Sequence, residues 1–278
     1  MALSDESTFD LSGAVVALRG SSADLRAAIE AHWAAFRVAP RASWLDVTLC
    51  ETDGPFGSGR PLTAVFVGDG GVARFETPEG RITVDGVGRA ELVLARGPLN
   101  ERLHALVNLV LSALATEAPA RGLLVVHAAG IVIDGLGFAL VGPAGSGKTT
   151  WLEIAARTVA PISDDLVGVD VAGAHVEILA LPFRRAPSPA AGPGRWPLRA
   201  ILVPAHGPAH RLEAIDPRIV RAAVVANLPH LPPTVRTAPV VTAAIDRLLR
   251  EVALRRLVFA RDPGFLDPLR ALAACAER

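Results

Sequence analysis

Lysine is nearly absent from this chain of 278 residues: among its 28 basic residues, Lys148 is the one lysine and all the others are arginine. A net charge is absent as well, because 28 acidic residues balance the basic ones. Without an excess of positive charge or a dense basic run, the chain has no field that attracts nucleic acid or an anionic membrane. We therefore expect neither as a partner.

Cysteines and long apolar runs are also scarce. Cys50 and Cys275 are far apart and have no metal-ligand spacing around them, so we predict no role for either. Apolar runs such as LLVVHAAGIVI are shorter than the ~20 residues that a membrane span needs. The polar segment 1–13 lacks the pattern of a secretory signal. With 51% hydrophobic residues, the composition predicts a globular protein. The lack of a signal pattern predicts that it is cytoplasmic.

The first part of the chain is rich in strand-forming residues. One segment there, 23–36, has helical spacing, and a second helix is expected at 99–117. The other segments cluster β-favouring residues between glycine, aspartate and proline. These predicted strands are 13–20, 44–50, 63–68, 72–76, 81–85 and 90–95.

From Gly122 onward the pattern becomes strand, turn, strand, loop and helix. Asp134 and Gly135 separate two apolar segments, which predicts a tight β-hairpin. After the next helix we expect strands in PISDDLVGVDV, HVEILALPF and LRAILVPA. Helices are expected at 216–227 and 240–254, a strand at 255–260 and a short helix from 265. Residues 184–197, rich in proline, glycine and arginine, predict an exposed loop near the site.

The single lysine lies in VGPAGSGKTT, whose spacing G-x-x-x-x-G-K-[ST] predicts a phosphate-binding loop of the Walker A type. Glycines let backbone N–H groups surround phosphate oxygens, and a compact ammonium reaches the terminal phosphates. Arginine is not equivalent there, so a lysine kept in an arginine-rich chain itself indicates function. We expect this loop to bind ATP, with the Thr149 hydroxyl as a Mg²⁺ ligand. The predicted nucleotide-binding residues are Gly142, Gly145, Ser146, Gly147, Lys148, Thr149 and Thr150.

The scarcity of lysine also excludes a class of nucleotide-binding proteins. GTPases of the switch type recognise guanine with an Asn-Lys-x-Asp motif, and no second lysine exists to form one. An ATPase motor is not supported either, because no second strand ends in the acid-plus-glutamate pair that activates water in such proteins.

Asp164 and Asp165 follow a predicted strand about fifteen residues after the loop. A parallel sheet would bring them to the edge where the phosphates lie. One could hold Mg²⁺ and the other could accept a proton from an attacking hydroxyl. We assign the proton to Asp164 and the metal to Asp165, although these roles are interchangeable from the sequence. The alternative for the pair is a surface turn or helix cap.

His127 interrupts the apolar strand that is expected to pair with the strand before the loop. It is either a core histidine with satisfied hydrogen bonds or a catalytic imidazole that faces the phosphates.

Together, HAAG, the hairpin, GPAGSGKTT and ISDD resemble the catalytic core of the HPr kinase/phosphorylase family and its peptide-kinase relatives. In that family a histidine on the preceding strand, the phosphate loop and two aspartates form the active site. His127, Lys148, Thr149, Asp164 and Asp165 match those positions. The resemblance covers about 40 residues, and it implies phosphorylation of a serine hydroxyl.

The resemblance also suggests further residues. Glu177, in HVEILALPFRR, is the nearest match to a metal-binding glutamate of the family, and its alternative is a solvated strand residue. Arg184, Arg185 and Arg195 could contact the transferred phosphoryl group, and Trp196 could contact the substrate. The strand-rich first part and the HAAG motif are most similar to the lasso-peptide kinases, so a peptide or small-molecule acceptor is favoured over HPr protein.

The predicted fold is α/β: a P-loop kinase core of the HPr kinase type at 121–278, with a strand-rich α+β N-terminal module at 1–120. The predicted function is an ATP-dependent kinase that uses Mg²⁺. Its acceptor would be the serine-type hydroxyl of a peptide, a protein or a small molecule. The alternative is a nucleotide-gated regulatory module with little or no phosphotransfer, and homo-oligomerisation is left open.

Overall fold

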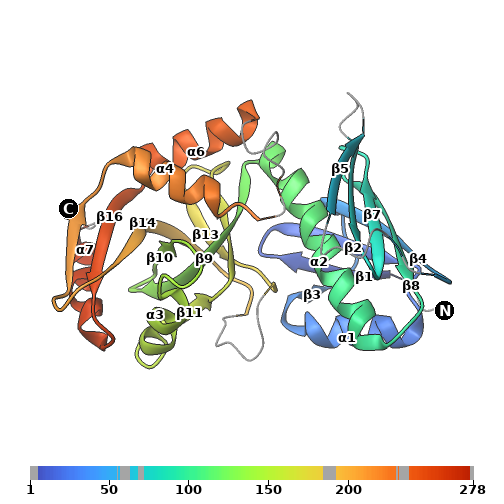
Figure 1. Cartoon of the computed structure of the whole chain (residues 1–278), viewed down its shortest axis with the longest axis horizontal. Coiled ribbons are helices and arrows are strands. Elements are labelled where there is room, and N and C mark those ends of the chain that lie inside the picture. The colour runs from blue at the N-terminus through green and yellow to red at the C-terminus, as the bar shows by residue number, and fades with distance from the viewer. Residues whose placement is uncertain are drawn as a thin grey trace. The chain divides into compact units, whose positions relative to one another are not determined.

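A computed structural model describes residues 6–54, 56, 63–67, 72–183, 192–229, 231 and 238–275, with the backbone alone at 63–67. The chain divides into two compact units: the first comprises the residues up to Ala118 together with Leu231, and the second comprises the other described residues from Pro119 onward. Each unit contains a mixed β-sheet with helices packed on it (Figure 1). The protein is therefore a mixed α/β protein, and each unit is described separately.

The sheet of the first unit has the strand order β3-β1-β2-β4-β8-β7-β6-β5. β2, β4 and β8 run parallel to one another, and the remaining neighbours are antiparallel. The predicted strands are confirmed, whereas β1 and β3 were not predicted. The strands are β1 (Glu6–Leu11), β2 (Ala14–Arg19), β3 (Arg37–Val38), β4 (Leu45–Thr52), β5 (Thr63–Val67), β6 (Val72–Thr77), β7 (Gly80–Val84) and β8 (Arg89–Ala95).

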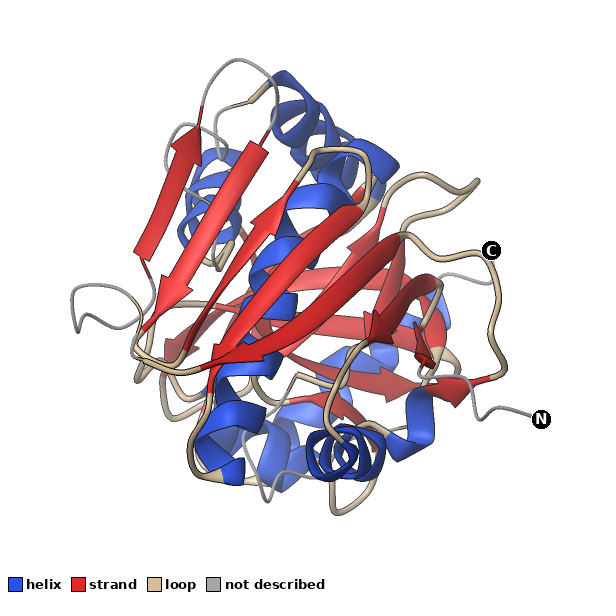
Figure 2. Ribbon diagram, turned by 90° about the vertical axis from the view of Figure 1, so that its right-hand side faces the viewer, coloured by secondary structure: helices blue, strands red, loops and turns tan. Residues whose placement is uncertain are grey.

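Helix α2 (Leu99–Glu117) covers one face of this sheet, and α1 (Ala23–His32) packs beside it (Figure 2). Leu106, Leu109 and Val110 are fully buried, at the spacing that places them on one face of the helix. The segment Leu99–Arg121 is long and apolar enough to cross a membrane, but 67% of its most apolar stretch is buried inside the protein. We therefore interpret α2 as a core helix of the first unit.

The sheet of the second unit has the order β10-β9-β12-β13-β14-β16-β15, and β11 pairs with β9. Its strands are β9 (Leu123–Ile133), β10 (Leu136–Val141), β11 (Ala160–Ser163), β12 (Leu166–Asp170), β13 (Glu177–Ala180), β14 (Arg195–His206), β15 (Arg211–Ala214) and β16 (Ala253–Phe259). The hairpin of β9 and β10 is confirmed, with positive φ angles of 50° at Asp134 and 77° at Gly135. Residues 195–197 belong to β14, so the predicted loop at 184–197 was too long at this end. Arg184 and Arg185 lie outside the described residues.

Strand β9 changes partners partway along its length. Residues 123–127 pair with β12, whereas residues 128–133 pair with β10 on one edge and residues 130–132 with β11 on the other. The expectation of a parallel sheet around the aspartates was therefore wrong, because β10, β11 and β12 are all antiparallel to β9. These three strands nevertheless share one direction, so β10 and β11 end near the same point of β9. Asp164 and Asp165 therefore still lie at the edge of the sheet where the glycine-rich loop begins.

Helix α3 (Lys148–Ala155) and α7 (Leu266–Ala274) bury one face of this sheet, where Trp151, Phe138 and Phe265 form part of the core. α4 (Pro217–Ala226) and α6 (Pro239–Glu251) lie on the opposite face (Figure 1). β10, β14 and β16 run parallel, so their carboxyl ends meet at one edge. Ligands of sheets with parallel strands bind at such edges.

Candidate functional site

The glycine-rich loop, residues 142–147, connects β10 to α3. Gly145 and Gly147 have φ angles of +78° and +93°, which favour glycine. Gly142 is also needed, because a Cβ there would lie 2.8 Å from Ser146 Oγ and 2.9 Å from Pro204 Cγ. Gly147 is the N-cap of α3, so the first backbone N–H groups of the helix open toward the loop. A strand, a glycine-rich turn and a helix N-terminus follow in the order that an anion site requires.

Lys148 is the first residue of α3, and only 7% of it is exposed. Its Nζ donates hydrogen bonds to two loop carbonyls, Gly142 O at 2.6 Å and Pro143 O at 3.1 Å. Burial lowers the pKa of Lys148, and the negative charge of Asp165 opposes this shift. The contacts of the ammonium are thus with neutral oxygens. A buried ammonium whose contacts are neutral is well suited to bind an anionic ligand.

Asp164 and Asp165 occupy the corner between β11 and β12, so the single strand predicted at 161–171 is divided into two at the aspartates. The buried Ser163 hydroxyl accepts the backbone N–H groups of Asp165 and Leu166, both at 3.3 Å, and so stabilises this corner. The Asp165 carbonyl accepts a hydrogen bond from the Ala128 N–H at 3.1 Å. Asp164 Oδ1 is buried and has no hydrogen-bond partner in the part of the chain that the structure describes. A buried carboxylate oxygen without a donor is costly, so its position requires another explanation.

His127 lies at the end of the β9 segment that pairs with β12. Its Nε2 is 3.3 Å from Asp165 Oδ1, with 37% of the histidine side chain and 30% of the aspartate side chain exposed. Its backbone N–H donates to Asn227 O at 2.7 Å, which connects β9 to the end of α4. His127 is therefore placed beside the carboxylates rather than in the core.

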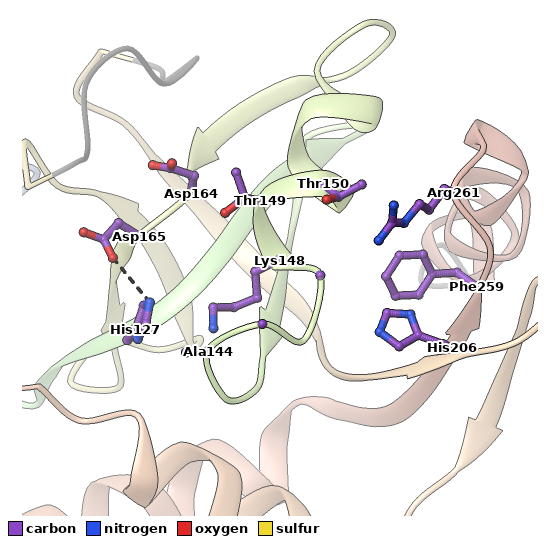
Figure 3. Close-up of a pocket in the computed structure, with 12 residues that line it drawn as sticks. His127, Ala144, Lys148, Thr149, Thr150, Asp164, Asp165, His206, Phe259 and Arg261 are labelled. Atoms are coloured by element: carbon purple, nitrogen blue, oxygen red, sulfur yellow. Dashed lines mark ion pairs between the residues drawn. The ribbon is translucent and has the colours of Figure 1, made fainter.

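These residues surround a cleft of about 310 Å³ (Figure 3). The structure brings His127, Lys148, Thr149 and both aspartates to this cleft, together with residues that the sequence did not single out. The full lining is His127, Ala144, Gly145, Gly147, Lys148, Thr149, Thr150, Asp164, Asp165, His206, Phe259 and Arg261.

His206, Phe259 and Arg261 were missed because nothing in their local sequence resembles a motif. Their positions along the chain could have identified them. His206 directly follows the predicted strand 198–205, Phe259 lies at the end of the predicted strand 255–260, and Arg261 directly follows that strand. Had those strands been recognised as parallel to the strand before the loop, the residues at their carboxyl ends would have been candidates.

Glu177 is not brought to the cleft. Its carboxylate receives a hydrogen bond from Arg195 at 2.6 Å, and the same guanidinium pairs with Asp170. Arg195 and Trp196 lie at the start of β14 and are not among the cleft residues. The predicted metal role of Glu177 and the predicted substrate contacts of these β14 residues have no support from this placement.

A metal ion held by protein side chains alone is not indicated: within the described ranges, no group of three or more histidines, cysteines or acids is suitably arranged. The oxygen donors among the cleft side chains are the hydroxyls of Thr149 and Thr150 and the carboxylates of Asp164 and Asp165. Such hard oxygen donors suit Mg²⁺, which usually takes one or two protein ligands and completes its shell with phosphate and water.

Comparisons with known proteins show no family for this chain. No family model matches it, and no curated protein matches it. The solved structures that it resembles include the HPr(Ser) kinase/phosphatase from Coxiella burnetii. The identity is 10% and the TM-score is 0.31, over 55% of this chain and 97% of the other. A similarity this low establishes neither family nor activity, so the function must be argued from the site.

Proposed function

We propose that this protein is an ATP-dependent kinase that transfers the γ-phosphoryl group to a serine-type hydroxyl of a peptide, a protein or a small molecule. The observation that carries the proposal is the cleft itself, where a buried lysine at a helix N-terminus shares one cavity with two carboxylates and a histidine. The lysine and the helix N-terminus suit a polyphosphate, and the carboxylates and the histidine suit an acceptor hydroxyl that attacks it.

Triphosphate binding follows from the loop. The backbone N–H groups of residues 145–149 provide hydrogen-bond donors for phosphate oxygens. The N-terminus of α3 adds a partial positive charge, and the Lys148 ammonium adds a full one. The cleft volume of about 310 Å³ suits a small-molecule ligand. The Lys148 ammonium contacts neutral carbonyl oxygens, so bound β- and γ-phosphates would provide it with a counter-charge.

Thr149 and Asp165 fit a magnesium ion that accompanies the nucleotide. Both line the cleft, and their oxygens are the donor type that Mg²⁺ prefers. When bound, the ion would neutralise charge on the β- and γ-phosphates during transfer.

Phosphoryl transfer assigns distinct tasks to the remaining residues. The acceptor oxygen forms a bond to the γ-phosphorus, the bond to the bridging oxygen breaks, and ADP leaves with its electron pair. The acceptor proton goes to the carboxylate of Asp164, which lines the cleft. Lys148 and His127 stabilise charge on the transferred group, and the contact with Asp165 orients the imidazole.

The choice of a serine-type hydroxyl follows from the resemblance of residues 127–165 to serine kinases, because the cleft itself favours only a small nucleophile close to the carboxylates. The test is mass spectrometry of candidate peptide, protein and small-molecule acceptors after incubation with Mg·ATP. A gain of about 80 Da on a serine is expected for one phosphoryl group.

Asp164→Asn provides the decisive variant. We expect the transfer rate to fall by about 10²-fold or more, because the proton acceptor is lost, while ATP affinity changes by less than about twofold. Asp267→Asn is the matched control, since Asp267 is an exposed carboxylate on α7, and it should behave as the wild type. Unchanged transfer by Asp164→Asn would remove Asp164 from the mechanism. ATP binding without transfer to any acceptor would favour the nucleotide-gated regulatory module.

A further inference from the structure

One side of the cleft takes no part in the chemistry proposed above. His206 ends β14 and Phe259 ends β16, and the two residues are partners in the parallel register of these strands. Arg261 follows two residues later, and all three line the cleft. We call these three residues the β14–β16 wall.

The β14–β16 wall has a buried base and an exposed surface. Phe259 is 2% exposed, with ring centroids 5.8 Å from His206 and 5.7 Å from Phe265. His206 and Arg261 are exposed. Phe259 therefore supports the imidazole from behind, and the surface available to a ligand is formed by one aromatic ring and one guanidinium.

The wall directly adjoins the glycine-rich loop. A Cβ at Gly147 would lie 3.3 Å from His206 Cε1 and 3.5 Å from Phe259 Cζ, so the loop backbone packs against both rings. A ligand that leaves the loop on this side meets His206 immediately. Position 147 favours glycine because its φ is +93°.

Figure 3 shows how the functional side chains are distributed about the loop. His127, Asp164 and Asp165 lie on one side of Lys148, whereas His206, Phe259 and Arg261 lie on the other side, with Thr150 between Lys148 and Arg261. If the terminal phosphate faces the carboxylates, the polyphosphate chain runs past Thr150 toward the wall. This step rests on the proposed function.

We propose that the β14–β16 wall binds the nucleoside half of the triphosphate, with the base against His206 and Arg261. An aromatic ring and a planar guanidinium both stack on a base. The acceptor would then enter from the opposite end, beside His127 and the two aspartates. Phe259 acts as a positioning residue, because it holds the imidazole and is itself covered.

The test compares two ligands that share three phosphates but differ in the nucleoside. Affinities for Mg·ATP and for Mg·tripolyphosphate are measured by titration calorimetry on the wild type, His206→Ala and Arg261→Ala. Each wall variant should weaken ATP binding by about tenfold, the effect of losing one stacking partner, with tripolyphosphate affinity unchanged within about twofold. His175→Ala, which removes an exposed histidine outside the cleft, is the control and should change neither affinity.

The outcomes separate this inference from the proposed function. If the wild type binds neither ligand, the proposed function fails. If the wild type binds both but the wall variants keep full ATP affinity, the nucleoside lies elsewhere and this inference is overturned. An equal loss of both affinities would show that the wall contacts phosphate and would likewise overturn it. Far-ultraviolet circular dichroism of each variant establishes that it is folded.

Discussion

Each of the two units contains a basic side chain that is almost fully buried, and the two are treated very differently. Arg102 in the first unit is 8% exposed and Lys148 in the second is 7% exposed. Arg102 donates to Glu51 at 3.0 Å, to Ser22 Oγ at 3.2 Å and to Asp24. Lys148 donates to two neutral carbonyls.

The pKa shifts follow these surroundings. Hydrogen bonding to Asp24 raises the pKa of Arg102, and the same contact lowers the pKa of Asp24 to about 2. Burial lowers the pKa of Lys148. Arg102 and its acidic partners satisfy one another within the first unit, so removing one of them leaves a buried charge unpaired. Lys148 contacts no acid among the described residues and gains a counter-charge when an anion binds. Asp164, whose buried Oδ1 has no hydrogen-bond partner among the described residues, lines the same cleft as Lys148.

The largest expected effect comes from removing the lysine. Lys148→Ala should lower kcat/KM for phosphotransfer by about 10²- to 10³-fold, because the charge that holds the terminal phosphates is lost. The free energy of unfolding should not decrease, since a poorly solvated cation has been removed. Coupled-assay kinetics and urea denaturation check the two parts. A destabilised protein with normal kinetics would give Lys148 the structural role that we assign to Arg102.

The opposite pattern is expected at Arg102. Arg102→Ala should reduce the free energy of unfolding by about 2 to 3 kcal/mol, because Glu51 is left partly buried without its partner. Mg·ATP affinity should change by less than about twofold. Hydrogen exchange should accelerate in peptides from α1 and α2. The control is Arg96→Ala, which breaks an exposed pair with Asp53 and should cost less than about 0.5 kcal/mol.

The smallest effect concerns pH and sharpens the comparison. A polyanion binds best when Lys148 is protonated, so Mg·ATP affinity should fall as pH rises through the lysine pKa, which lies below its ordinary 10.5. Phosphate ionisation is complete well below this range. Affinity measured from about pH 7 to pH 10 should show the fall. Lys148→Arg should bind more weakly but without this fall, because arginine stays charged. A wild-type profile as flat as that of Lys148→Arg would contradict the assignment.

Local chemistry explains which parts of the fold could be predicted from the sequence. The hairpin turn was predictable because Asp134 and Gly135 tolerate positive φ, and α2 because its apolar residues follow helical spacing. β3 and β15 were missed because they are short and carry little apolar pattern, so pairing with neighbours defines them. The strand directions around β9 were predicted wrongly, because direction depends on tertiary pairing.

The same distinction applies to the candidate site. The loop and the aspartates have local patterns, and the structure places them in one cleft. Glu177 was selected from a resemblance that does not specify its neighbours, and its neighbour is Arg195. His206 and Arg261 come from segments more than fifty residues apart, and only the parallel pairing of β14 with β16 brings them together.

The change of partners along β9 limits how this chain can vary. Successive side chains of a strand point to opposite faces, so one residue inserted between Leu124 and His127 would turn His127 away from Asp165 or shift the hairpin out of register. The length of β9 is therefore constrained from both ends. The turn at residues 172–175, between β12 and β13, is held in another way, by hydrogen bonds that Arg247 donates to Gly173 O at 2.6 Å and Ala174 O at 3.4 Å. A change of length there would cost these contacts but would leave the pairing register of β9 intact.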